Sequence, residues 1–303
     1  MNPANPNNYC GRFAPSPTGP LHLGSLVAAV GSYLQAKSRQ GQWLVRIEDL
    51  DPPREIPGAA DAILRTLERY GLYWDKTVTY QSQRHNAYAA ALDELTRQGV
   101  LYPCDCSRKE VAATGRAGPY GMIYSGRCRA HHKAGTTSRS ALRVRVHDQP
   151  IVFEDALRGR VSQQLAQEVG DFVVRRADGL FAYQLAVVVD DAAQGITEVV
   201  RGSDLLDNTP RQIHLQQLLK YPTPRYCHLP LVLNTKGEKL SKQSGAKSIE
   251  NHPPQTLILE ILNLLNQTPP TALKEASLDE LWQWAIRRWQ LASVPRTNLT
   301  GPR

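Results

Sequence analysis

Hydrophobic and polar positions divide the first hundred residues into short and longer segments. Short segments at residues 10–14 and 42–47 predict strands, whose successive side chains point to opposite faces of a sheet. Longer segments at residues 23–39, 58–70 and 84–98 predict helices. In the second of these helices the apolar residues fall at helical spacing, namely Ile63, Leu64, Leu67 and Tyr70. The chain therefore begins with alternating strands and helices.

The pattern breaks up from about residue 102, where cysteines, glycines and short alternating segments such as residues 141–146 predict an inserted subdomain lasting to residue 179. The α/β pattern then resumes in four segments, at residues 183–189, 196–201, 210–220 (a helix) and 228–233 (a strand). Strands that alternate with helices form parallel sheets joined by crossovers. We therefore expect an α/β fold in two halves, residues 1–101 and 180–250, split by residues 102–179. Residues 251–303 are expected to form a short helical region, with helices over about residues 253–291 followed by a disordered tail.

Composition limits the class of protein. The 303 residues are 41% hydrophobic and 21% charged, as in a soluble globular protein. No run approaches the ~18 apolar residues of a membrane helix, and the polar start is unlike a signal peptide, so we expect a cytoplasmic location and no membrane. The net charge of +8 supports a polyanionic partner such as a nucleic acid, although composition alone slightly favours a diffusely basic, solvated surface.

Three of the five cysteines, Cys104, Cys106 and Cys128, lie close together in the predicted insertion. In a cytosolic chain such crowding indicates a metal site rather than disulfides, the alternative being reduced buried cysteines. Three thiolates and one nitrogen or oxygen satisfy tetrahedral zinc. By spacing, His131 or His132 is the natural fourth ligand, and Tyr124 lies nearby.

Two segments far apart in the chain have the features of a nucleotide site. Residues 15–25 follow a predicted strand and open a helix, where backbone N–H groups and the helix dipole bind phosphate. His22 can donate to phosphate oxygens there, although a simple Pro/Gly turn that caps a helix fits the segment as well. Lys239 and Lys242 lie on a glycine-flanked loop that can close over a triphosphate, although a solvated basic loop is the commoner outcome of this spacing.

Together these two segments resemble the HIGH and KMSKS signatures of class I aminoacyl-tRNA synthetases. The chain is similar to glutamyl-tRNA synthetases over about residues 10–250, in segments that keep the family's order: residues 11–19, 45–49, 183–191, 201–204 with 208–212, and 239–242. Two positions depart from the signatures. Ser25 occupies the last position of HIGH, where the signature has histidine, and Leu240 replaces the methionine of KMSKS. The resemblance implies a Rossmann-like parallel sheet that carries the catalytic site.

The resemblance also implies the site residues. For ATP, bound with Mg²⁺, these are Pro15, His22, Gly24, Ser25 and Lys242, with His22, Lys239 and Lys242 catalytic. For L-glutamate they are Arg12, Phe13, Ala14, Pro15, Ser16, Glu48, Tyr183 and Arg201. Arg201 is our choice for the side-chain carboxylate and Glu48 for the ammonium, since cations and an acid are what glutamate requires. Tyr183 is expected to form a wall of the pocket.

Within this family the chain resembles the short glutamyl-Q tRNA(Asp) synthetases. The resemblance rests on Arg201-Gly202-Ser203-Asp204 and on the few residues after the KMSKS-like loop, too few for an anticodon-binding domain. It implies tRNA-independent formation of glutamyl-adenylate and transfer of glutamate to queuosine in the anticodon loop of tRNA(Asp), by a monomer. The alternatives are a minimal glutamyl-tRNA synthetase that charges the 3′ end, a non-catalytic tRNA-binding paralogue, and a nucleotidyltransferase of the same superfamily.

The same resemblance decides our choice of the fourth zinc ligand. The Tyr124-x-x-x-Cys128 spacing is similar to that of short paralogues in which a tyrosine oxygen completes the site. We therefore expect a structural zinc on Cys104, Cys106, Tyr124 and Cys128, with no open position for chemistry.

Overall fold

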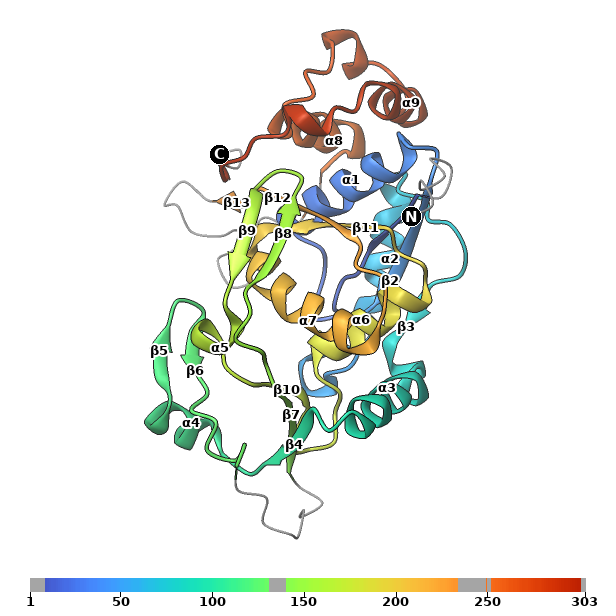
Figure 1. Ribbon diagram of the computed structural model, residues 1–303. Helices are drawn as coiled ribbons and strands as arrows, with labels where there is room; N and C mark the ends of the chain where they lie inside the picture. The colour runs from blue at the N-terminus through green and yellow to red at the C-terminus, as the bar shows by residue number, and fades with distance from the viewer. Residues whose placement is uncertain (1–8, 131–139, 234–248, 250–251, 301–303) are drawn as a thin grey trace.

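The computed structural model describes residues 9–130, 140–233, 249 and 252–300 (Figure 1). Two groups of parallel strands form the centre of the molecule. The first has the order β1–β2–β3 and the second the order β11–β12–β8–β9, in which only β8 and β9 are antiparallel. The groups meet where the Thr197 amide donates to the Cys10 carbonyl oxygen at 2.8 Å. The strands are β1 (Cys10–Phe13), β2 (Gln42–Ile47), β3 (Thr79–Tyr80), β8 (Ile151–Asp155), β9 (Gly159–Gln163), β11 (Glu198–Gly202) and β12 (Arg225–Leu229).

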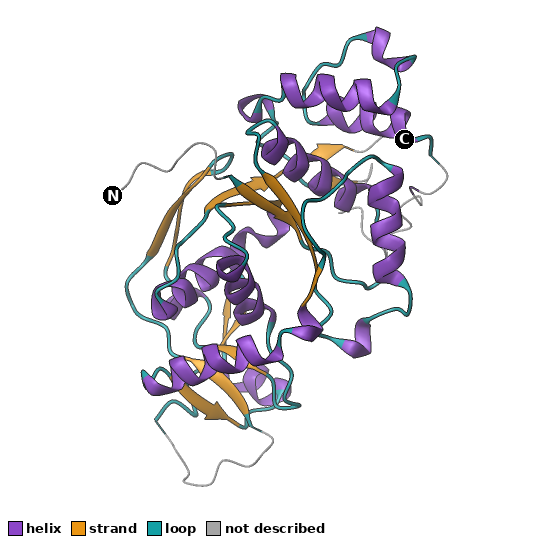
Figure 2. Cartoon of the chain, turned by 90° about the vertical axis from the view of Figure 1, so that its right-hand side faces the viewer, coloured by secondary structure: helices purple, strands orange, loops and turns teal. Residues whose placement is uncertain are grey.

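Helices lie on both sides of these strands (Figure 2). They are α1 (Leu23–Lys37), α2 (Ala59–Arg69), α3 (His85–Arg97), α6 (Tyr183–Ala193) and α7 (Thr209–Leu219). Successive residues of a strand belong to different hydrophobic cores, one on each face of the sheet. Val200 of β11 packs in the core with α1 and α2, while Val199 packs in the core with α3, α6 and α7. This alternation is what a parallel sheet covered on both faces requires. The expected α/β architecture is therefore confirmed.

The apolar segment at residues 183–189 lies within α6, and residues 196–201 contribute β11. All seven residues from Gln184 to Asp190 are buried, so the helix has no polar face from which its period could be recognised. The predicted strand at residues 228–233 is divided between β12 and β13 (Val232–Leu233).

The predicted insertion contains a separate antiparallel sheet of order β10–β7–β4. The helices and strands of the insertion outside the central sheet are β4 (Leu101–Cys104), α4 (Arg108–Thr114), β5 (Arg116–Gly118), β6 (Gly121–Ile123), β7 (Ala141–Val144), α5 (Leu165–Glu168) and β10 (Phe172–Arg175). The β8–β9 hairpin lies in the same stretch of sequence but joins the central sheet, because Asp155 pairs in register with Tyr226 of β12. The domain boundaries drawn from the sequence stay predictions.

The C-terminal region packs against α1 through α8 (Pro254–Leu264) and α9 (Leu278–Arg288) (Figure 1). The expectation of a disordered tail after residue 291 is wrong for residues 292–300. Val294 and Leu299 are buried, and β14 (Leu299–Thr300) pairs with β13. A short segment with two apolar residues gives no periodicity, and its order comes from a strand edge about 65 residues away in sequence.

Short 3₁₀ helices complete the description: Pro52–Arg54, Gln81–Gln83, Ser203–Asn208, Thr271–Lys274 and Leu291–Ser293. Among the residues described, no helix combines the length and the apolar character needed to cross a membrane.

Candidate active site

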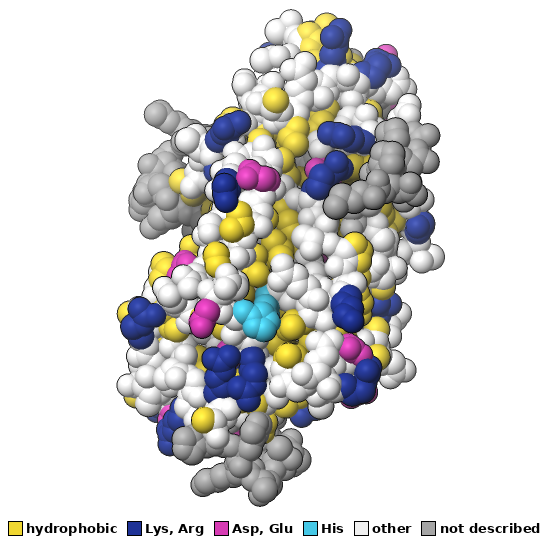
Figure 3. Space-filling model, in the orientation of Figure 1, with side chains coloured by type: hydrophobic (Ala, Val, Ile, Leu, Met, Phe, Trp, Pro, Cys, Tyr) yellow, Lys and Arg dark blue, Asp and Glu magenta, His cyan; other side chains and the backbone are white. Residues whose placement is uncertain are grey.

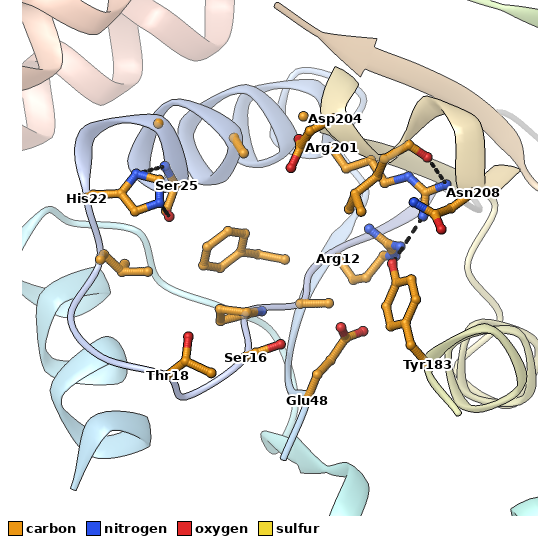
Figure 4. Close-up of a pocket in the computed structure, with 18 of the residues that line it drawn as sticks. Arg12, Ser16, Thr18, His22, Ser25, Glu48, Tyr183, Arg201, Asp204 and Asn208 are labelled. Atoms are coloured by element: carbon orange, nitrogen blue, oxygen red, sulfur yellow. Dashed lines mark hydrogen bonds between the residues drawn. The ribbon is translucent and has the colours of Figure 1, made fainter. Parts of the chain in front are cut away.

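A cavity of about 870 Å³ opens where β1 and β11 end and α1 begins. It brings together every residue proposed from the sequence for ATP or glutamate that the structure describes: Arg12, Phe13, Ala14, Pro15, Ser16, His22, Gly24, Ser25, Glu48, Tyr183 and Arg201. Lys239 and Lys242 lie outside the described residues. Figure 4 shows two ends of the cavity, with His22 and Ser25 at one and Arg12, Tyr183 and Arg201 at the other.

At the first end, His22 is the N-cap of α1. Its Nδ1 accepts from the Ser25 amide at 3.2 Å, so Nδ1 carries no proton and Nε2 donates to the Ser25 hydroxyl, 3.0 Å away. Gly19 has a φ of 130°, a conformation that residues with a Cβ rarely adopt. The turn therefore leads into α1 with amides and a neutral imidazole beside the cavity, which suits an anionic group.

At the opposite end, Arg12 is held by Asp191. Arg12 donates from Nε and Nη2 to the two carboxylate oxygens of Asp191 at 3.1 and 3.3 Å. Burial opposes ionisation of Asp191, but Arg12 and Arg46 hold its pKa below the ordinary value. The Arg12 side chain is therefore fixed at the cavity wall, with its charge matched by a buried carboxylate.

Glu48 follows β2 and lies at the edge of a buried ionic network. Its Oε1 is 3.4 Å from Nη2 of the fully buried Arg46, whose Nη1 is 2.8 Å from Asp191. Burial raises the pKa of Glu48, and the charges of Arg46 and Arg12 oppose that shift. Within the described chain this single long bond is the one hydrogen bond that the Glu48 carboxylate accepts, which leaves it available to a cationic group in the cavity.

Arg201 differs from Arg12 and Arg46 in its partners. It donates to neutral acceptors: Nε2 of His228 at 3.1 Å, Oγ1 of Thr209 at 2.9 Å, the Leu205 carbonyl at 3.3 Å and the Tyr183 hydroxyl at 3.5 Å. In the part of the chain that the structure describes, no carboxylate lies within ion-pair distance of its guanidinium. Arg201 is 5% exposed, so its positive charge is buried, and none of the described residues supplies a matching anion.

Several residues of the site were missed from the sequence. Asp191, which holds Arg12, lies in the last turn of the apolar helix α6, and a buried carboxylate there needs a buried cation. Asp204 and Asn208 line the cavity near Arg201. Both belong to segments that carried the resemblance, but their residue types alone assign no role.

The three clustered cysteines also come together. The sulfur atoms of Cys104, Cys106 and Cys128 all lie within 4.8 Å of one another. The Tyr124 hydroxyl is 3.4 Å from the Cys104 sulfur and 3.7 Å from that of Cys106, and it accepts from the Cys128 amide at 2.9 Å. Three cysteine sulfur atoms and one phenol oxygen therefore lie close together, and this donor set fits a tetrahedral metal. His131 and His132 lie outside the described residues.

Basic side chains occur in separate places over the face shown in Figure 3. Lys and Arg are spread along the length of the described surface, whereas Asp and Glu occupy fewer places. With a net charge of +8, this distribution suits contact with a polyanion along an extended surface.

Comparison with protein families gives a match to the model described as "tRNA synthetases class I (E and Q), catalytic domain" over residues 10–273. Two curated relatives are both named glutamyl-Q tRNA(Asp) synthetase. The protein from Aromatoleum aromaticum is 54% identical over 95% of this chain and 91% of its own length, and that from Thiobacillus denitrificans is 56% identical over 96% of each.

Among solved structures, a glutamate tRNA ligase from Elizabethkingia meningosepticum, crystallised with its amino acid, superposes with a TM-score of 0.80 and 26% identity. The match covers 96% of this chain and 66% of that chain.

Proposed function

The chain belongs to the class I tRNA synthetases for glutamate and glutamine, and we propose that it activates L-glutamate with ATP and transfers it to queuosine of tRNA(Asp). The proposal that glutamate is activated with ATP rests on one observation. The turn that contains His22 and the charged side chains of Arg12, Glu48 and Arg201 line the same cavity. The names of relatives more than half identical to the chain support the acceptor.

The amino-acid end of the cavity matches the charges of glutamate. Arg201 offers an unmatched guanidinium to the side-chain carboxylate, and charge-assisted bonds of this kind are about twice as strong as neutral ones. Glu48 offers a carboxylate to the ammonium. Tyr183, whose pKa burial raises, stays a neutral donor beside Arg201. The α-carboxylate is thereby directed toward the end that contains His22.

ATP, carried as its Mg²⁺ complex, occupies the His22 end. The α-carboxylate of glutamate attacks the α-phosphorus, forming glutamyl-adenylate and releasing pyrophosphate, so no covalent enzyme intermediate is needed. The turn at residues 15–25 positions the nucleotide, while Lys239 and Lys242 stabilise charge on the phosphates. A hydroxyl of the queuosine ring then attacks the acyl carbon, and AMP leaves.

The proposal includes a zinc ion at the cysteine cluster, with a structural role. The small core around the cluster consists of Tyr102, Cys104 and Tyr124, so the local fold has little apolar burial to stabilise it. A closed site with Cys104, Cys106, Tyr124 and Cys128 as ligands would hold β4, α4 and β6 together. We also expect a monomer that acts in the cytoplasm, as the sequence predicts.

The fourth ligand is tested by Tyr124→Phe. We expect the purified wild-type protein to contain one zinc per chain with three sulfur ligands and one oxygen ligand by X-ray absorption, and Tyr124→Phe to lose the oxygen ligand and release zinc faster to a chelator. Tyr120→Phe, on the nearby exposed hairpin, is the matched control and should behave as wild type. Full zinc with unchanged ligation in Tyr124→Phe would contradict this assignment.

Activation is tested by ATP–pyrophosphate exchange without tRNA. We expect exchange that depends on glutamate and is much weaker with glutamine at the same concentration. Exchange that requires tRNA, or none with any amino acid, would contradict the proposal.

A further inference from the structure

A buried chain of hydrogen bonds runs behind the cavity from Asp155 through His228 to Arg201. Oδ2 of Asp155 is 2.6 Å from Nδ1 of His228, and Nε2 of His228 is 3.1 Å from Nε of Arg201. The side chains of Asp155 and His228 are both 0% exposed. Neither residue lines the cavity, so neither contacts a ligand there directly, and the hydrogen bond to Arg201 links them to it.

The chemistry of the three groups fixes the protons. The Nε of arginine is always a donor, so Nε2 of His228 has to be the acceptor and its proton resides on Nδ1, which donates to Asp155. Burial lowers the pKa of His228 to about 4, so the ring is neutral near pH 7. Burial alone would raise the pKa of Asp155, but the bonds from His228 and from the Leu157 and Arg158 amides hold it below its ordinary value.

This arrangement keeps the Asp155 carboxylate away from Arg201. Asp155 is one imidazole ring removed, and the groups that accept from the guanidinium are uncharged. By contrast, Arg12 and Arg46 are matched directly by Asp191 and its neighbours. Of these three arginines, Arg201 is the one whose charge is left for a ligand.

We propose that Asp155 and His228 are positioning residues for Arg201, which hold its guanidinium toward the cavity with its charge unmatched and so favour a carboxylate side chain over an amide in the bound amino acid. This inference rests on the proposed function, because it takes glutamate as the ligand. It also gives the β8–β9 hairpin a role in the site, since Asp155 reaches His228 only because β8 pairs with β12.

The test is Asp155→Asn, which keeps the shape of the side chain. Its carbonyl can still accept from the Leu157 and Arg158 amides, which places the NH₂ group against Nδ1 of His228. The ring proton then moves to Nε2 and faces Nε–H of Arg201, so these two donors meet. Within the described chain, the one other acceptor beside Nε2 is the Thr209 hydroxyl, 3.2 Å away, which already accepts from Arg201. By calorimetry we expect the Kd for glutamate to rise about tenfold or more. The Kd for glutamine and the KM for ATP should change less than about twofold.

Two further variants separate positioning from general damage. His228→Gln in the Asp155→Asn background should recover much of the glutamate affinity, because the glutamine carbonyl has two lone pairs and can accept both from Arg201 and from the NH₂ group introduced at residue 155. Asp148→Asn, an exposed aspartate that precedes the same hairpin, should match wild type. If Asp155→Asn does not fold, single His228→Gln should bind glutamate more tightly than His228→Leu.

The outcomes distinguish this inference from the proposed function. Glutamate binding by the wild type with no loss in Asp155→Asn, or an equal loss of glutamate and glutamine binding, would overturn the positioning role alone. Absence of glutamate binding and exchange in the wild type would overturn both.

Discussion

Replacing Arg201 with methionine is expected to reduce kcat/KM for glutamate in ATP–pyrophosphate exchange by about 10²- to 10³-fold. Methionine keeps the apolar stem but leaves the substrate carboxylate without its cation, and removing one partner of a buried charged pair costs about 2–5 kcal/mol. The loss should lie mainly in KM for glutamate, because the side-chain carboxylate is bound in the ground state and in the transition state alike. The measurement is steady-state exchange at varied glutamate, without tRNA.

Arg225→Met is the matched control for this variant. Arg225 lies on the adjacent strand β12, pairs with Glu198 at 3.6 Å and does not line the cavity. We expect it to keep the wild-type KM for glutamate. Arg201→Lys should recover only part of the loss, since an ammonium cannot reproduce the fork of a guanidinium. A wild-type KM in Arg201→Met would remove Arg201 from glutamate recognition.

Lys242→Ala is expected to reduce kcat for exchange by about 10²-fold or more while glutamate binding is retained. A positioned cation aimed at charge that develops on the phosphates contributes on this scale. Lys242 lies outside the described residues, so this prediction rests on its place in the KMSKS-like segment. Exchange kinetics at saturating ATP, combined with glutamate calorimetry, measures the two effects separately.

An exposed lysine elsewhere serves as control. Lys274 lies in the C-terminal region, and Lys274→Ala removes the same charge from the chain without touching the cavity. It should leave exchange unchanged. Full exchange in a folded Lys242→Ala protein would exclude this lysine from the mechanism.

The contrast between Arg201 and its supporting residues illustrates what sequence can and cannot predict here. Arg201 belongs to a segment with a recognisable pattern, and its residue type matches the demand of a carboxylate. Asp155 and His228 are 73 residues apart in sequence, and they meet only through the register that pairs Asp155 with Tyr226. No local pattern encodes that register, so the pair could not be found from the sequence.

Prediction of the fold from sequence is limited in the same way, because distant pairings leave no local pattern. Strands β1 and β2 and helices α1–α3 were predicted within a few residues, and in α2 and α3 the buried residues lie on one face at helical spacing. Helix α6 is buried almost all round, so its run of apolar residues has no polar face to show a helical period. The β13–β14 pair depends on a distant partner strand, and the prediction of a disordered tail failed there.

The measurement that tests the proposed function most directly is transfer of labelled glutamate to tRNA whose 3′-terminal nucleotide has been removed, with and without queuosine in the tRNA. Periodate is unsuitable for blocking because it also attacks the queuosine diol. We expect label on the shortened tRNA only when queuosine is present. Label that requires an intact 3′ end and ignores queuosine would contradict the proposal and identify a minimal glutamyl-tRNA synthetase.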